Sequence, residues 1–298
     1  MQQLRKMPEP GSEEEKQMSE DINKALVELV DYASALLSRC LNAMELTIEN
    51  VVSLTLFRHV IELTDSIQVQ IENKVVAPTI LQLRSIFETL LYLEFIFVCP
   101  KKTSSRVRSY EWHVVRDQWK YFQSFVTLEK EKSLTPKKRK FFKMQNASID
   151  LYKEIKRMEA KLSGPEWEDI LNERDRLKML GKNLRNTEWF TLFPENDAKL
   201  VPQNLADLAK TLCRYDDYKV FFVRASKMMH PKDIGRHLKH VEGLRSLRDL
   251  EVLLPNFRHT TSYVNVAIGI MIRQYRSEEE GDYNKWYREH IQTVLNKY

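Results

Sequence analysis

One stretch, residues 78–98 (PTILQLRSIFETLLYLEFIFV), constrains the fold more than any other part of the chain. It opens with Pro78, which suits the first position of a helix because the N–H that proline lacks would be unbonded there anyway. Apolar residues then fall on nearly every side of the expected helix, so other helices should surround it. Arg84 and Glu88 interrupt the run four residues apart and therefore share one face, where we expect an ion pair.

A membrane span is the first alternative for this stretch. Arg84, Glu88 and Glu94 fall near its middle, and each charged group would cost about 2.5–3.5 kcal/mol at the centre of a bilayer. We therefore expect the central helix of a soluble bundle, with no contact with a membrane.

Glycine and proline are scarce, with 7 and 10 copies in 298 residues, whereas 30% of residues are charged. Long helices with short connections follow from this composition, and sandwiches or α/β folds, which use glycine in turns, are disfavoured. The sequence predicts an all-α fold, an elongated multi-helix bundle. The net charge of +5 permits nucleic-acid binding without arguing for it.

The domain organisation follows from changes of composition along the chain. Residues 1–17 are polar and predict a disordered tail, and residues 18–298 predict a single helical domain. Within it, residues 130–187 predict a charged helical insertion that projects from the bundle and breaks around Ser163-Gly164-Pro165. The helix expected before this insertion is decorated by Arg106, Arg108, Glu111 and Arg116.

Several short features have ordinary explanations. The basic run Pro136–Lys140 resembles a nuclear-import signal, but a solvated helix start or loop is the expected structure. Cys40, Cys99 and Cys213 lie far apart without metal-ligand spacing, which is typical of core cysteines in a reducing compartment. His237 and His240 stand beside Glu242 without a further ligand cluster, so we expect no metal and no cofactor. An apolar leader is absent from the first residues, so a cytoplasmic location is expected.

A second polar stretch, Tyr218 to His230, could carry chemistry. On a helix Tyr218, Phe222, Ser226 and His230 form one stripe, and Pro231 biases His230 away from helical geometry. Two interpretations remain open. His230 could face a cleft beside the Ser226 hydroxyl, or it could cap the helix end while Ser226 bonds a carbonyl one turn back.

Two family resemblances bear on these residues. Arg84-xxx-Glu88, Trp189, Tyr215-xx-Tyr218 and Ser226-xxx-His230-Pro231 together resemble an uncharacterised family of helical bacterial proteins, over roughly residues 25–275. The family is a domain of unknown function, so the resemblance implies no activity.

More distantly, Arg224-ASKMM-His230 resembles the motif of the HEPN ribonucleases (higher eukaryotes and prokaryotes nucleotide-binding), in which an arginine precedes a histidine by four to six residues. This resemblance implies metal-independent cleavage of RNA across a dimer interface. His230 would move the proton of the 2′-hydroxyl and Arg224 would stabilise charge on the phosphorane. Ala225 departs from the motif, which usually has a polar residue there.

Two functional hypotheses follow. The first is an RNA-directed effector, a metal-independent ribonuclease or toxin of bacterial defence or toxin–antitoxin type, with RNA, a neutralising or activating protein and a second copy of the chain as expected partners. Its expected site consists of catalytic Arg224, Ser226 and His230 and supporting Arg84, Glu88 and Tyr218. The alternative is a non-enzymatic interaction or regulatory module in which the same residues only lock helix packing.

Overall fold

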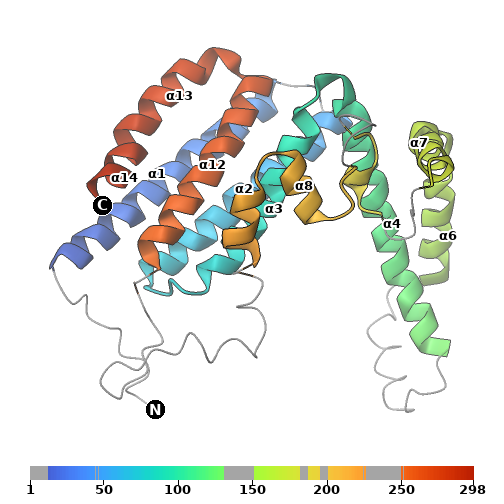
Figure 1. Cartoon of the computed structure of the whole chain (residues 1–298), viewed down its shortest axis with the longest axis horizontal. Helices are drawn as coiled ribbons and strands as arrows, with labels where there is room; N and C mark the ends of the chain where they lie inside the picture. Colours follow the sequence, from blue (N-terminus) through green and yellow to red (C-terminus); the bar gives the residue numbers. More distant parts are fainter. Residues whose placement is uncertain are drawn as a thin grey trace. The chain divides into compact units, whose positions relative to one another are not determined.

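The computed structural model describes residues 13–43, 45, 47–130, 151–181, 187–194, 201–223, 225, 250 and 252–298 (Figure 1). Helices are the regular secondary structure throughout these ranges, which confirms the predicted all-α, multi-helix fold. The chain divides into two compact units. Unit 1 combines Met1–Val98 with Leu205–Tyr298, and unit 2 is Cys99–Asn204. No helix within the described ranges is both long and apolar enough to cross a bilayer.

Four long helices form the body of unit 1: α1 (Glu13–Ala43), α2 (Ile48–Glu72), α3 (Thr79–Phe97) and α12 (Leu253–Tyr275). α2 packs against α1 and α3, and α12 packs against all three (Figure 1). Segments from the two ends of the printed sequence thus share one core. Shorter elements complete the unit: α8 (Leu205–Thr211), α9 (Tyr215–Asp217), η5 (Tyr218–Phe222), η7 (Ser277–Glu279), α13 (Glu280–Tyr287), η8 (Arg288–Gln292) and α14 (Thr293–Lys297).

α3 is surrounded as its composition predicts. It contacts α2, α12, α8 and the π-helical turn η5, and most of its apolar side chains are fully buried. Its start is tied to α12 by a hydrogen bond of 2.9 Å from the Asn256 amide to the Thr79 hydroxyl. The prediction of a central helix is therefore confirmed.

A turn at Asn73-Lys74 ends α2. Lys74 has a φ of 57°, and its N–H bonds the Ile71 carbonyl while the next N–H, of Val75, bonds Gln70. This arrangement is a Schellman cap, which satisfies carbonyls that a helix end leaves open. At the other end of α2, the Thr47 hydroxyl accepts from the Asn50 N–H, so threonine caps the helix as threonine commonly does.

The first helix begins earlier than the sequence suggested. α1 starts at Glu13, inside the stretch for which we expected a loose tail. Glu13, Glu14 and Glu15 occupy its first turn, where negative charge is favoured by the helix dipole. Residues 1–12 lie outside the described residues.

The last helices pack on α1. Trp286 stacks on Tyr32 with ring centroids 4.4 Å apart. The Arg39 Nη2 and Nε atoms donate to the two carboxylate oxygens of Glu279 at 2.8 and 3.2 Å. Asp21 accepts from both Lys297 and Tyr298, at 2.7 and 2.8 Å. The Lys297 hydrogen bond is the main reason why the pKa of Asp21 falls from 3.8 to about 2.

Unit 2 is organised on α4 (Thr103–Lys130), which follows the short η2 (Pro100–Lys102). Two helices pack on it, α6 (Leu151–Leu162) and α7 (Glu168–Met179), with η3 (Pro165–Trp167) between them. The break predicted around Ser163-Gly164-Pro165 is thus confirmed. A core of Trp112, Trp167, Ile170, Leu177 and Leu192 joins these elements. Unit 2 therefore contains α4 as well as the charged stretch. That residues 18–298 form one domain stays a prediction.

Side chains of α4 and η2 hold residues 187–194, which include the short 3-10 helix η4 (Trp189–Thr191), through hydrogen bonds to their carbonyls. Arg106 donates to Phe193 at 3.1 Å, Ser109 to Trp189 at 2.7 Å, and Arg116 to Thr187 at 2.9 Å, and Lys102 donates to Pro194. Arg106 is 0% exposed and Arg116 9%. These arginines therefore lie inside the unit rather than decorating its outside, because a segment with little regular structure needs donors for its buried carbonyls.

Candidate functional site

The supporting residues predicted on α3 lie half-buried and contact different partners. The guanidinium carbon of Arg84 lies 4.4 Å from the centroid of the Phe222 ring, and Glu88 accepts a hydrogen bond of 2.7 Å from the Tyr92 hydroxyl. Among the described residues, the ion pairs do not include one between Arg84 and Glu88. In the described part of the chain, Arg84 contacts an aromatic ring instead, and Glu88 bonds within its own helix.

Tyr218 belongs to a row of stacked rings at the π-helical turn η5. Its ring is 6.1 Å from that of Tyr215 and 5.1 Å from that of Phe222, nearly parallel to both. Phe222 is also the ring under Arg84. The structure therefore brings Arg84 and Tyr218, which are 134 positions apart in the printed numbering, to the same aromatic side chain. π-Helical turns are rare and occur often at functional sites.

The predicted catalytic residues Arg224, Ser226 and His230 lie outside the described residues. The same holds for the possible metal ligands at 237, 240 and 242 and for the basic run Pro136–Lys140. In the part of the chain that is described, no group of three or more His, Cys, Asp or Glu side chains is placed to hold a metal ion.

Two residues that sequence reasoning missed adjoin this place, His259 and Tyr263 on α12. Their rings are 5.8 Å apart, His259 lies 4.9 Å from Phe221, and Tyr263 lies 5.2 Å from Phe87 of α3. The i, i+4 spacing of the pair was a usable signal, but the apolar character of this helix concealed it. Tyr263 is 1% exposed, and its hydroxyl has no hydrogen-bond partner among the described residues.

Burial sets the protonation of this pair. It lowers the pKa of His259, against the opposing charge of Asp217, so the imidazole is neutral at pH 7 and can accept a proton. Burial also raises the pKa of the Tyr263 phenol, with Asp217 adding to the effect, so the phenol keeps its proton. One aromatic cluster thus has a proton acceptor (His259), a proton donor (Tyr263) and a cation (Arg84) around it. These are the groups that acid–base catalysis on an anionic substrate requires.

The principal ion pair of α3 is formed by Glu94 and Arg214. The Arg214 Nη2 and Nε atoms donate to the two carboxylate oxygens at 2.7 and 2.9 Å, and both side chains are about one-fifth exposed, at 21% and 18%. Arg214 also contacts Asp217, at 3.4 Å. This pair fixes the segment that leads into η5 against α3.

The backbone before Arg214 explains how the segment turns. Cys213 has a φ of 58°, and the N–H of Arg214 bonds the Ala209 carbonyl at 2.7 Å while that of Cys213 bonds Lys210. α8 therefore ends in a second Schellman cap, with a cysteine where glycine is usual. The cap redirects the chain so that Arg214 reaches Glu94.

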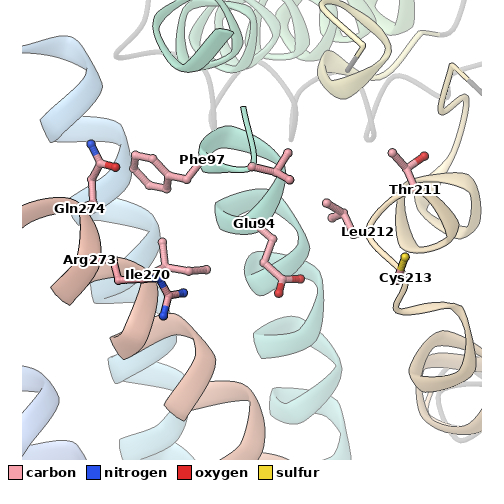
Figure 2. Close-up of a pocket in the computed structure, with 9 residues that line it drawn as sticks. Glu94, Phe97, Thr211, Leu212, Cys213, Ile270, Arg273 and Gln274 are labelled. Carbon is pink, nitrogen blue, oxygen red and sulfur yellow. The ribbon is translucent and has the colours of Figure 1, made fainter. Parts of the chain in front are cut away.

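A pocket of about 410 Å³ lies beside this ion pair. Figure 2 shows its walls coming from α3, the end of α8 and the last turns of α12. Phe97 and Ile270 supply apolar wall, while Glu94, Arg273, Gln274 and the exposed thiol of Cys213 supply polar groups. Its size and mixed lining suit a small organic molecule.

Of three comparisons with known proteins, only the comparison with protein families found a match. No curated protein and no solved structure shows significant similarity to the chain. One family model matches residues 50–243, a span that holds Arg84, Glu88, Tyr218 and the predicted catalytic residues and ends before His259. Membership of an uncharacterised family, expected from the sequence, is confirmed, and the relation to HEPN ribonucleases stays a prediction. The chain belongs to the family of unknown function DUF5677.

Proposed function

We propose that the protein is an RNA-directed effector that cleaves RNA without a metal ion. One observation carries the proposal: Arg84 and Tyr218, from two separate predicted motifs, meet at Phe222, and the neutral His259 and the protonated Tyr263 adjoin the same cluster. Cleavage of RNA through the 2′-hydroxyl needs a base, an acid and a cation for the phosphorane. These residue types are present in the cluster.

The roles divide as follows. His259, neutral at pH 7, takes the proton of the 2′-hydroxyl, and its oxygen attacks the adjacent phosphorus. His230 in its protonated form returns a proton to the departing 5′-oxygen, which leaves a 2′,3′-cyclic phosphate. Arg84 and Arg224 stabilise the charge that grows on the phosphorane oxygens. Ser226 and Tyr218 hold the substrate, and Tyr263 donates a hydrogen bond. A second copy of the chain and a neutralising partner are the expected interaction partners, in the cytoplasm.

The test uses a synthetic RNA with excess chelator. We expect wild type to produce fragments ending in 2′,3′-cyclic phosphate, and a substrate with a 2′-deoxy sugar at the cleaved position to resist. His259→Gln and His230→Ala should each reduce cleavage by about 10²-fold or more. His59→Gln is the matched control, because His59 is an exposed histidine on α2 of the same unit. Equal cleavage by the His259→Gln and wild-type proteins would remove His259 from the mechanism.

The contacts of the charged side chains of α3 favour a second candidate, a non-enzymatic interaction module. Glu94–Arg214, Glu88–Tyr92 and Arg84–Phe222 all have structural explanations as contacts between or within helices. In that case wild type leaves RNA intact, in the presence or absence of its partner, and Arg84→Met lowers the melting temperature. Cleavage that is lost in Arg84→Met at an unchanged melting temperature would exclude the module.

A further inference from the structure

The pocket beside the Glu94–Arg214 ion pair lies within unit 1. Its volume of about 410 Å³ is in the range of sites for small organic molecules. Figure 2 shows Glu94 of α3 between the lining residues of α12 and those at the end of α8. The described residues to which we assign RNA cleavage do not line it, so an inference about its ligand is independent of that function.

One part of the pocket wall is apolar. The Phe97 ring meets the ring of Tyr275 edge-on, with centroids 6.3 Å apart, and Ile270 is buried against the helix bundle, at 7% exposure. Val98 also lines the pocket and is 46% exposed. A hydrocarbon chain laid on these side chains would leave water together with their surface, which is favourable. The wall therefore favours a ligand with an apolar body.

The two charged side chains of the lining differ in how firmly they are paired. Glu94 is held by two hydrogen bonds from Arg214. Arg273 has its ion-pair partner, Glu280, at 3.9 Å, which is too long for a hydrogen bond, and the two side chains are 59% and 50% exposed. An exposed pair of this kind contributes little to stability. The Arg273 guanidinium can therefore exchange Glu280 for a ligand at little cost.

These charges favour a ligand with a single negative charge. A guanidinium binds a carboxylate through two parallel hydrogen bonds, and Gln274 adds an amide donor to the lining. A phosphate dianion would bring a second negative charge next to Glu94, whose partner Arg214 already contacts two carboxylates. An amine would meet the positive charge of Arg273. A carboxylate is the anion that suits this lining.

We propose that this pocket binds an amphipathic monocarboxylate, with the carboxylate on Arg273 and the hydrocarbon body against Phe97 and Ile270. A medium-chain fatty acid is the simplest member of this class. Cys213 lines the pocket on the other side of α3 from Arg273, as Figure 2 shows, and its thiol is exposed. The accessibility of this thiol therefore reports whether the pocket is filled.

The test measures binding by titration calorimetry at pH 7.5 and equal ionic strength, with octanoate, octanamide and octyl phosphate as ligands. Octanoate should bind. Octanamide should bind at least about tenfold more weakly, because its hydrogen bonds to Arg273 lack the negative charge. Octyl phosphate should also bind more weakly, since it loses its second proton at about pH 6. Failure of octanoate to bind, or equal affinity for octanamide, would overturn the proposal.

Chemical modification shows where octanoate binds. In a Cys99→Ser background Cys213 is the exposed thiol that remains, because Cys40 is buried. Octanoate should slow the alkylation of Cys213 by iodoacetamide, followed by mass spectrometry, with the concentration dependence found by calorimetry. An unchanged rate of alkylation at saturating octanoate would contradict binding in this pocket.

Two variants separate the carboxylate contact from the apolar contact. Arg273→Gln should weaken octanoate binding at least about tenfold and leave octanamide binding unchanged, which a general loss of folding would not do. Val98→Asp should weaken the binding of both ligands. Arg258→Gln is the matched control, because it removes an exposed cation of α12 that does not line the pocket. Undiminished octanoate binding in Arg273→Gln would overturn the proposal.

Discussion

Unit 1 and unit 2 bury polar groups of different kinds. Among the described residues, the buried polar side chains of unit 1 are hydroxyls and amides: Thr64 and Thr260 bond a carbonyl one turn back in their own helix, and Asn256 bonds Thr79 of α3. The buried arginines and histidines among the described residues all belong to unit 2, where Arg106 and Arg116 reach carbonyls more than 70 positions away. The buried polar contacts of unit 1 are therefore made by neutral groups, whereas unit 2 depends on hydrogen bonds from buried cations to distant segments.

The largest difference between the units should appear when one buried polar group is made apolar. Arg106→Met leaves the Phe193 carbonyl without this donor, and we expect unit 2 to lose about 2–4 kcal/mol. Thr64→Val in unit 1 should change stability by less than about 1 kcal/mol, because the Val60 carbonyl keeps its helical N–H partner. Urea unfolding followed by tryptophan fluorescence in a Trp286→Phe background reports unit 2, since the other four tryptophans lie there. A stable Arg106→Met would contradict the comparison.

The second largest difference between the units should be the pH at which acid lowers their stability. Burial lowers the pKa of His113 to about 3 in the folded protein, whereas this pKa has its ordinary value of 6.5 in the unfolded chain. Between these pH values the unfolded chain therefore binds more protons. Stability of unit 2 is then complete above pH 6.5 and falls by up to about 1.4 kcal/mol per pH unit below it.

The Asp21 carboxyl of unit 1 behaves differently, because its folded pKa of about 2 lies below 3.8. The stabilisation that Asp21 provides is present above pH 3.8 and is lost only as the pH falls toward 2. In the Trp286→Phe background, tryptophan fluorescence should therefore change at a higher pH than the contact of α14 with α1, which is followed by hydrogen exchange. His113→Phe should remove the early transition, and coincident transitions without that substitution would refute this assignment.

A smaller effect is expected at the ion pair of α3. Glu94→Gln replaces a bidentate pair with a single neutral acceptor beside the partly buried Arg214, and we expect a loss of about 1–3 kcal/mol. Glu88→Gln should cost less, because Glu88 accepts its hydrogen bond from Tyr92 of the same helix, and a glutamine oxygen can still accept it. The measurement is urea unfolding by far-ultraviolet circular dichroism. Equal losses in the two variants would show that the Arg214 contact adds nothing to unit 1.

The smallest effect is expected at Cys213, and the same change at Phe193 should have the opposite sign. Cys213 and Phe193 both have left-handed backbones, with φ of 58° and 54°. Cys213 is exposed, so Cys213→Gly should raise the stability of unit 1 by about 0.5–1 kcal/mol by removing strain. Phe193 packs against the Trp112 core, so Phe193→Gly should lower the stability of unit 2. Stabilisation by both glycines would show that packing in unit 2 contributes less than the backbone.

The sequence predicted those parts of the fold that local patterns determine. The apolar run of α3 and the break at Ser163-Gly164-Pro165 each depend on neighbouring residues. The burial of Arg106 could not be predicted, because its acceptor lies in an irregular segment 87 positions away. The same applies to Glu94, whose partner Arg214 is 120 positions distant.

In the candidate site, too, features set by local spacing could be predicted, and contacts with distant segments could not. Tyr218 and Phe222 share a helical stripe, as predicted, and local spacing was enough to find it. Arg84 was singled out because a charge in an apolar helix is conspicuous, but its partner was assigned by spacing to Glu88 rather than to Phe222. His259 and Tyr263 escaped notice because nothing in an apolar helix indicates which of its faces meets another segment.

The discontinuity of unit 1 has a consequence for synthesis on the ribosome. α1, α2 and α3 emerge first, but α12, which covers all three, follows only after the whole of unit 2. At the usual pace of translation this delay is roughly ten to thirty seconds. During that time Leu83, Phe87 and their buried neighbours are exposed to other nascent chains, whereas unit 2 already has every segment that it needs. We therefore expect chaperones to act chiefly on the N-terminal three helices while the chain is being made.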